Sequence, residues 1–392
     1  MNFFSRCWID RFFFLDYQGY QGYQKQMMEV VTPAAAVGYR FTLLLDFEGN
    51  VWGCGDNSNG QQGRCDHIWC APKKIPHPLN QPIQAIAAGF HHSLFLTSSG
   101  EVWGCGGNQT GQLGIEFHQN DSILTRIPLS FSTKAISCGN DYSHFVSDGG
   151  EVWGCGSNAS GQLGVDRRGI QPVPIKLKLN GIAKVCGARC LTLFLDASGT
   201  VWKAGTFSAD FLSDQKLQKI TTSKPIKSIA VGQYHTLLLQ KDGTVLSCGS
   251  NIKGQLGFDS EICQIDSHPG RPLRNLPPIT EIFAGDYQSF FIDENLDVWG
   301  CGRNMFGQLG LGSTTNQPVS LTKIPFSPSS VASFASGDGH TIVIDNGRAW
   351  GTGLNDHHQL TSSDAKISQF ILLDEVLLAP GATSVKSARA TN

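Results

Sequence analysis

The segment VWGCGDNSNGQQG, which begins at Val51, decides the fold because close copies of it recur along the chain. The copies read VWGCGGNQTGQLG from Val102, VWGCGSNASGQLG from Val152, VWKAGTFSADF from Val201, VLSCGSNIKGQLG from Val245, VWGCGRNMFGQLG from Val298 and AWGTGLNDHHQLT from Ala349. Each copy follows a G-x-x segment whose first glycine recurs roughly every 50 residues, at Gly38, Gly89, Gly139, Gly187, Gly232, Gly285 and Gly337. An internal repeat of this period is typical of propellers, solenoids and arrays.

Each copy predicts a small antiparallel sheet. Segments such as FTLLLD from Phe41 and TLLLQK from Thr236 are rich in apolar residues on both faces, so neighbouring sheets must cover both faces. A tight hairpin follows, in which a glycine such as Gly49 supplies the positive φ angle. The sixth copy has Asn295 and Leu296 at this turn, and we expect a different register there because leucine tolerates positive φ poorly.

Four strands in each of seven copies predict an all-β fold, a seven-bladed β-propeller built from repeats of about 50 residues. We expect residues 1–28 to form an N-terminal extension and residues 29–392 to form a single propeller. Its repeats are predicted near 29–80, 81–130, 131–180, 181–225, 226–278, 279–327 and 328–392. Residues 29–37 and 383–388 both resemble the first strand of a copy, so we expect the two chain ends to compete for, or share, the closing blade.

The repeat, G-x-x-H-[S/T] followed by D-G-x-V-[W/Y] and G-x-N-x-x-G-Q-L-G, resembles that of the regulator of chromosome condensation family over about residues 30–378. The resemblance implies a seven-bladed propeller. The founding family member is a guanine-nucleotide exchange factor for a Ran-type small GTPase, and its contacts include acidic residues of the G-x-x-H loop. Asp141, Asp286 and Asp338 stand at matching positions. The founding factor's wedge hairpin has no clear counterpart here, and the fourth copy departs from the pattern between residues 206 and 218.

Composition excludes several classes of protein. Lys and Arg total 30 and Asp and Glu total 32, a net charge of −2, so we expect no specific nucleic-acid partner. No apolar run reaches the roughly 18 residues of a membrane span, and the N-terminal aromatic residues are interrupted by charges, which argues against a signal peptide. We therefore expect a cytoplasmic or nuclear protein with reduced thiols.

Most residues of catalytic type occupy repeat positions that build the blades. The position after V-W-G holds Cys54, Cys105, Cys155, Ala204, Cys248, Cys301 and Thr352, so it requires a small volume rather than a thiol. His92, His235 and His340 share a position with Phe41, Tyr142, Cys190 and Gln288, which indicates hydrogen-bonded structural histidines. We predict no catalytic residue, no cofactor and no metal. The loop Cys65 to Cys70 offers three soft zinc ligands but lacks a fourth.

The two residues between the first glycine and the histidine position vary in chemistry while the surrounding frame does not. Aromatic and Arg residues, which are favoured at interface hot spots, are common among them. The candidate partner-binding rim consists of Tyr39, Arg40, Phe90, His91, Asn140, Asp141, Arg189, Tyr234, Asp286, Tyr287 and Asp338. An ordinary solvated rim is the alternative for any single residue. The sequence predicts a protein–protein interaction module, a regulator or scaffold; the alternative is nucleotide exchange on a Ran-type small GTPase.

Overall fold

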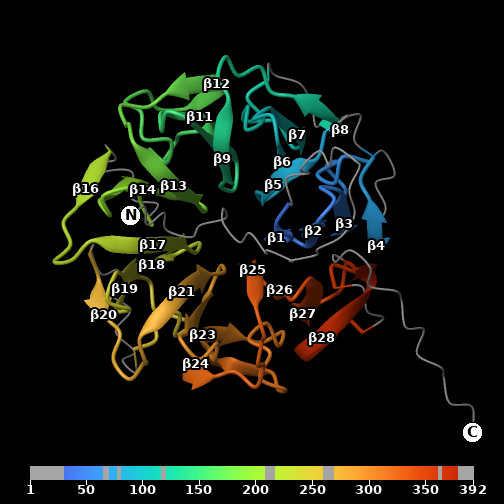
Figure 1. The fold of residues 1–392 in the computed structure, drawn as a ribbon, viewed down its shortest axis with the longest axis vertical. Helices are drawn as coiled ribbons and strands as arrows, with labels where there is room; N and C mark the ends of the chain where they lie inside the picture. The colour runs from blue at the N-terminus through green and yellow to red at the C-terminus, as the bar shows by residue number, and fades with distance from the viewer. Residues whose placement is uncertain are drawn as a thin grey trace, which may run out of the picture.

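The computed structural model describes residues 31–64, 70–76, 81–115, 121–207, 217–258, 269–360 and 364–377. These residues form seven four-stranded antiparallel sheets arranged as blades around a central axis (Figure 1). They include no helix, and therefore none that is long and apolar enough to cross a membrane. The prediction of an all-β, seven-bladed propeller is confirmed.

The first four blades contain sixteen strands. Blade 1 has β1 (Ala34–Val37), β2 (Phe41–Leu45), β3 (Val51–Gly55) and β4 (Cys70–Lys74). Blade 2 has β5 (Ile83–Ala88), β6 (His92–Thr97), β7 (Val102–Gly106) and β8 (Asp121–Arg126). Blade 3 has β9 (Thr133–Cys138), β10 (Tyr142–Ser147), β11 (Val152–Ser157) and β12 (Ile170–Lys176). Blade 4 has β13 (Ile182–Gly187), β14 (Leu191–Asp196), β15 (Val201–Gly205) and β16 (Gln218–Ile220).

The remaining three blades follow the same plan. Blade 5 has β17 (Ile226–Val231), β18 (His235–Gln240), β19 (Val245–Gly249) and β20 (Arg271–Pro272). Blade 6 has β21 (Ile279–Ala284), β22 (Gln288–Asp293), β23 (Val298–Asn304) and β24 (Thr315–Lys323). Blade 7 has β25 (Val331–Ser336), β26 (His340–Asp345), β27 (Arg348–Leu354) and β28 (Lys366–Leu377).

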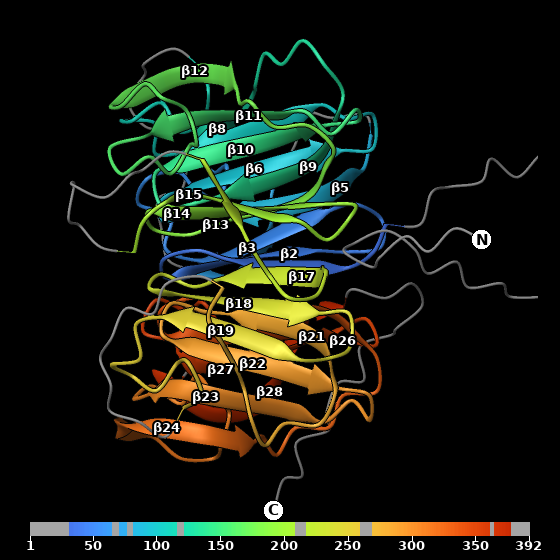
Figure 2. The ribbon, with the colours of Figure 1, turned by 90° about the vertical axis from the view of Figure 1, so that its left-hand side faces the viewer.

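In every blade the chain runs from the innermost strand outward, so the first strand of each copy surrounds the axis (Figure 1). Seen from the side, the strands of successive blades pack face to face (Figure 2). Phe41 at the start of β2 pairs with Gly55 at the end of β3. The loop between the first and second strands and the loop between the third and fourth strands therefore lie on the same face of the ring.

The hairpin of blade 6 corrects one sequence-based expectation. Leu296 adopts a φ of 65°, in the same region as the 79° of Gly49 in blade 1. Ile292 pairs with Val298, the same register as Leu45 with Val51. The expected change of register is therefore wrong. Asp293 holds the turn in this register, because its Oδ1 accepts hydrogen bonds from the backbone N–H groups of residues 295 and 297. Leu296 therefore adopts a backbone angle that is strained for leucine.

The hydrophobic core lies between blades rather than within one. All six residues of β6, β10, β18 and β22 are buried, as expected for strands covered on both faces. One cluster joins Leu237 and Leu239 of blade 5 to Ile282 and Phe291 of blade 6. Because each blade buries its apolar faces against its neighbours, an open ring would expose the apolar faces of its first and last blades.

Ring closure joins two complete blades. Leu44 of blade 1 packs with Ile342 and Ile344 of blade 7, and the N–H of Ala35 donates to Ser333 Oγ at 3.1 Å. Of the two segments expected to compete for the closing blade, the first supplies β1 of blade 1. The segment 383–388 lies outside the described residues, and blade 7 is completed without it by β28.

Candidate protein-interaction rim

The seven G-x-x loops converge on one face of the ring, around a central cavity of about 180 Å³. The cavity is lined by the first glycine of every copy. One further residue from each of the seven rim loops also borders it, namely Tyr39, Phe90, Asn140, Ala188, Gln233, Asp286 and Asp338. The sequence-predicted loops are therefore brought together by the fold, although they are separated by roughly 50 residues in the chain.

The inner wall is made of glycine because the blades approach one another too closely for a side chain. A Cβ atom on Gly139 would lie 2.0 Å from the ring of Tyr142 and 2.5 Å from the carbonyl oxygen of Ala188 in the next blade. Backbone hydrogen bonds also cross between blades here, from Phe90 N to Asn140 O at 3.1 Å and from Asn140 N to Ala188 O at 3.2 Å. The rim loops are thus held on a rigid frame.

Beneath three of the rim loops, a histidine links one blade to the next. His92 Nε2 lies 3.0 Å from Ser143 Oγ, His235 Nε2 lies 2.8 Å from Ser289 Oγ, and His340 Nε2 lies 2.9 Å from Thr42 Oγ1. The last of these contacts spans the closure between blades 7 and 1. Burial lowers the pKa of His92 and His235 to about 3 and that of His340 to about 4. These buried, neutral rings have the structural role that the sequence predicted.

Tyr142 and Gln288, which occupy the same repeat position in blades 3 and 6, also link neighbouring blades, with other side-chain groups. Tyr142 donates its hydroxyl hydrogen to Leu191 O at 2.8 Å. Gln288 Nε2 donates to Gly337 O at 2.6 Å. Exchange among His, Tyr and Gln is therefore possible because each side chain can reach the neighbouring blade.

A first aromatic cluster lies across blades 1 and 2. The rings of Tyr39 and Phe90 are stacked, with centroids 4.2 Å apart and planes 12° apart. His91 meets Phe90 edge-on at 4.6 Å. The Arg40 guanidinium carbon lies 5.0 Å from the Tyr39 ring centroid. All four side chains are half-buried, so they offer an ordered surface that combines aromatic area with a cation.

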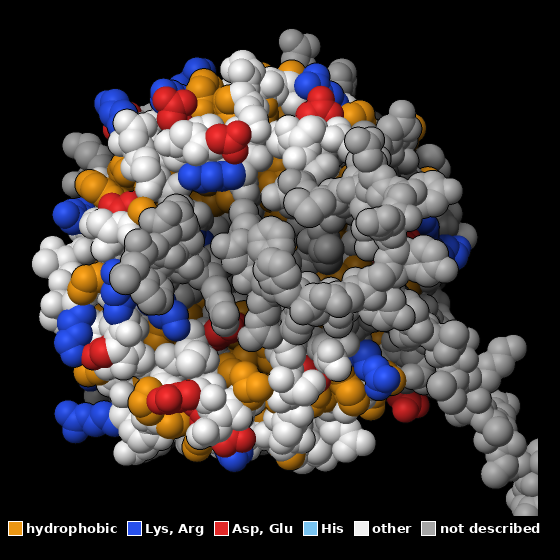
Figure 3. Space-filling model, in the orientation of Figure 1, with side chains coloured by type: hydrophobic (Ala, Val, Ile, Leu, Met, Phe, Trp, Pro, Cys, Tyr) orange, Lys and Arg blue, Asp and Glu red, His pale blue; other side chains and the backbone are white. Residues whose placement is uncertain are grey.

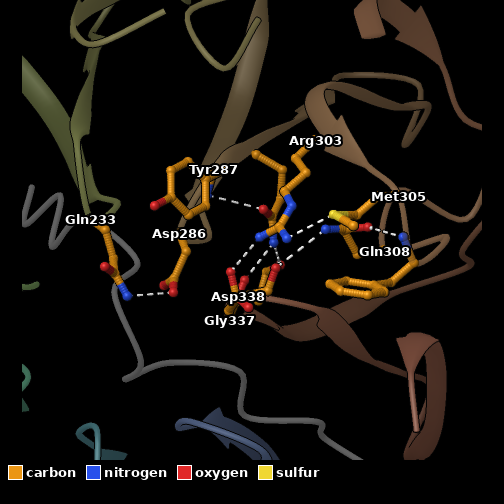
Figure 4. Close-up of polar contacts among 11 residues, drawn as sticks. Gln233, Asp286, Tyr287, Arg303, Met305, Gln308, Gly337 and Asp338 are labelled. Carbon is orange, nitrogen blue, oxygen red and sulfur yellow. Dashed lines mark hydrogen bonds and ion pairs between the residues drawn. The ribbon is translucent and has the colours of Figure 1, made fainter. Parts of the chain in front are cut away.

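A second cluster crosses blades 4 to 6. Arg189 donates to the hydroxyl of Tyr234, whose ring centroid lies 5.2 Å from that of Tyr287. The guanidinium carbon of Arg303 lies 5.5 Å from the Tyr287 ring and 5.0 Å from the Phe306 ring (Figure 4). Alternating guanidinium groups and aromatic rings of this kind are enriched at protein–protein interfaces.

Acidic residues complete this second cluster (Figure 4). Arg303 Nη1 forms an ion pair with Asp338 Oδ1 at 2.6 Å, with the two side chains 20% and 32% exposed. Asp286 accepts a hydrogen bond from Gln233 instead. Burial, together with the nearby charge of Asp338, raises the pKa of Asp286 to about 8. Asp286 is therefore largely protonated at neutral pH, whereas Asp338 neutralises Arg303.

Asp141, the third acidic residue, has a different environment. Burial raises the pKa of its carboxyl group, against the opposing effect of His91. Its backbone carbonyl accepts from Thr110 Oγ1 at 2.9 Å and from the N–H of Ser157 at 2.8 Å. The three acidic positions singled out by resemblance are thus not equivalent, and one of them is neutralised by protonation.

Two further residues of this face, Arg303 and His357, are not among the predicted rim residues. Arg303 occupies the position after G-C-G, which holds Asp56 in the first copy, Gly107 in the second and Leu354 in the seventh. That variability within a constant frame was the available signal, since it matches the behaviour of the rim loops. His357 lies in the loop between β27 and β28, on the same face, and contacts Arg40.

Over the face seen in Figure 3, the described Lys and Arg side chains are interspersed with Asp and Glu. Among the described residues no cluster of His, Cys, Asp and Glu could hold a metal ion, and eight cysteines form no disulfide bond. Cys105, Cys155 and Cys301 are fully buried, in keeping with a packing role. The candidate zinc ligands at positions 65 and 67 lie outside the described residues, as do residues 208–216 of the divergent fourth copy.

Two family models, both described as the Regulator of chromosome condensation (RCC1) repeat, match the chain. The first matches residues 48–96, 242–292 and 297–344, and the second matches residues 34–61, 83–112, 134–162 and 226–255. The chain belongs to this family. Neither model matches residues 163–225, which include the divergent fourth copy.

Relatives within this family have different activities. The chain is 29% identical over 340 residues to the human "Probable E3 ubiquitin-protein ligase HERC6", covering 83% of this chain but 24% of that protein. It is 24% identical over 380 residues to the Saccharomyces cerevisiae "Guanine nucleotide exchange factor SRM1", covering 81% of this chain and 69% of that protein. Yeast RCC1 (Prp20), solved bound to Kap60, has the same fold, with a TM-score of 0.74, 20% identity and coverage of 93% and 91%.

Proposed function

We propose that this protein is a protein–protein interaction module, a regulator or scaffold that binds its partner with the rim defined by the G-x-x loops. The observation that carries the proposal is the convergence of two ordered clusters of aromatic and guanidinium side chains, Tyr39 with Phe90 and Tyr234 with Tyr287, on one rigid face. Such residues supply large contact area at low conformational cost. The buried histidines serve packing and leave this face free for binding.

The test is to replace Phe90, Arg189, Tyr234 and Tyr287 together with alanine. None of these residues occupies a blade-building position, so the variant is expected to fold with an unchanged far-UV circular dichroism spectrum and to lose its partner. Capture with the full chain, read by quantitative mass spectrometry, measures the loss. The matched control replaces four exposed residues of the outer strands and of the loop that follows β12: Ile123, Ile170, Val173 and Lys178. Equal capture by both variants would contradict the proposal.

A second candidate function is nucleotide exchange on a Ran-type small GTPase. It is favoured by the similarity to SRM1, whose name states that activity, and by the acidic rim residues Asp141, Asp286 and Asp338. Within the described residues, the connections between strands supply no protruding hairpin of the kind the founding family member inserts. We therefore rank exchange below binding.

Release of labelled GDP from a Ran-type GTPase tests this candidate directly. We expect the full chain to accelerate release barely above the spontaneous rate. A large acceleration that is lost in Asp141→Ala or Asp338→Ala would reverse the ranking. Residues 206–218 of the fourth copy would then be the first segment to delete in search of a wedge.

A further inference from the structure

Two residues at the junction of blades 7 and 1, Arg40 and His358, have a positive φ although neither is glycine. Arg40 has a φ of 60°, whereas the residues at its position in the other six rim loops do not have positive φ. His358 has a φ of 58° at a position where five other copies have glycine, as in Gly60 and Gly307. Non-glycine residues held in this region store strain and concentrate at functional sites.

The side chain of Arg40, one of these two residues, is held in place by its neighbours. Its Nη1 lies 3.2 Å from Nε2 of His357, which is buried, and Nδ1 of the same ring lies 2.7 Å from Asp356 Oδ1. Donation from Arg40 fixes the tautomer, because Nε2 must accept and Nδ1 must then donate to the carboxylate. The guanidinium also lies over the ring of Tyr39. Backbone, hydrogen bond and ring together pre-organise one guanidinium group.

The pre-organised group still has donors to offer. Among the described residues, neither Nε nor Nη2 of Arg40 makes a hydrogen bond, and neither is a buried unpaired atom. The stacked rings of Tyr39 and Phe90 lie beside it and provide apolar surface. The planar guanidinium donors of Arg40 suit a planar anion, and the stacked rings beside them suit an apolar group next to that anion.

We propose that Arg40 is the anchor for a carboxylate of the partner protein, an Asp or Glu side chain that stands next to an aromatic or large apolar residue seated on Tyr39 and Phe90. This inference rests on the proposed function and names the chemistry of the partner at one end of the rim. The local charge favours a carboxylate over a phosphoryl group. The Asp356 carboxylate already interacts electrostatically with Arg40, and Asp56 donates its backbone N–H to the carbonyl oxygen of Arg40 at 2.8 Å, so one guanidinium would balance a further dianion poorly.

The test begins with a displayed library of random twelve-residue peptides selected on the full chain. Enriched sequences are synthesised with a fluorescent label, and their affinity is measured by polarisation. We expect them to share an acidic residue beside an aromatic or large apolar residue. Arg40→Lys keeps the charge but loses the planar fork, and we expect it to weaken binding at least tenfold. In Arg40→Lys, replacing the acidic residue of the peptide by its amide should weaken binding only slightly further. With the wild-type protein, a peptide that carries phosphoserine in place of the acidic residue should bind more weakly than the acidic peptide.

Three variants separate binding from folding. Arg40→Gly relieves the strained φ, so its thermal midpoint should equal or exceed that of the wild type while its affinity falls. His357→Leu removes the acceptor that positions Arg40 and should weaken binding, whereas His357→Gln retains an acceptor and should restore most of it. Rim-dependent peptides that bind Arg40→Lys as well as wild type would overturn this inference alone. A library with no peptide sensitive to the four-alanine rim variant would overturn the proposed function itself.

Discussion

The contact between His340 and Thr42 closes the ring, and its protonation state predicts how stability depends on pH. Burial lowers the pKa of His340 to about 4, against an unfolded-state value near 6.5. At a pH between these two pKa values, this histidine is therefore protonated in the unfolded chain but not in the folded chain. Stability is fully present above about pH 6.5 and is lost as the pH falls toward 4. From this one histidine, linkage lowers the free energy of unfolding by about 2 kcal/mol between pH 7 and pH 5.

The perturbation is His340→Gln. Glutamine already fills the equivalent position in blade 6, where Gln288 reaches the carbonyl of Gly337 in the next blade. The variant should therefore keep a link between blades at pH 7 without a titrating group, with a free energy of unfolding within about 1 kcal/mol of wild type. Between pH 7 and pH 5 it should lose about 2 kcal/mol less than wild type.

Equilibrium urea unfolding at the two pH values, followed by tryptophan fluorescence, measures both quantities. The difference between variant and wild type cancels the other titrating groups, including Asp286, whose raised pKa has the opposite effect on stability. His358→Asn is the matched control, since His358 is exposed and asparagine tolerates its positive φ. An unchanged pH dependence in His340→Gln would refute the assignment of a buried neutral histidine at the closure.

Three further predictions concern the frame of the propeller. Leu296→Asn should raise the free energy of unfolding by about 0.5–1 kcal/mol, because the leucine is strained at a φ of 65° and already 36% exposed; a destabilised variant would show that no strain is stored there. Gly139→Ala should destabilise by about 3 kcal/mol or more, because its Cβ would lie 2.5 Å from a backbone carbonyl, while Gly149→Ala, with nothing closer than 3.7 Å, should be close to neutral in the same urea titration. Cys105→Ala should cost about 1 kcal/mol, as the fourth blade has Ala204 at this position, and a cost above 3 kcal/mol would mean that the thiol itself is required.

The repeat period was sufficient to predict the architecture, because seven copies of a four-strand pattern leave a radial arrangement as the way to bury every apolar face. The packing role of the cysteine and histidine positions was also readable, since exchange among Cys, Ala and Thr, or among His, Tyr and Gln, reveals what a position requires. The turn at Leu296 was predicted wrongly because local backbone preference was outweighed by the hydrogen bonds of Asp293 and by strand pairing.

The sequence predicted which loops lie together on one rim, but it did not predict the protonation states and contacts of their side chains. Asp286 and Asp338 look alike in the sequence, yet burial protonates the first and Arg303 neutralises the second. The link between Arg40 and His357 joins residues 317 positions apart, and it exists only because the ring closes between the last blade and the first. Sequence periodicity fixes which residues build blades, because that requirement repeats in every copy. Which side chains meet across blades depends on the closed ring, because those contacts occur once and leave no repeating pattern to read.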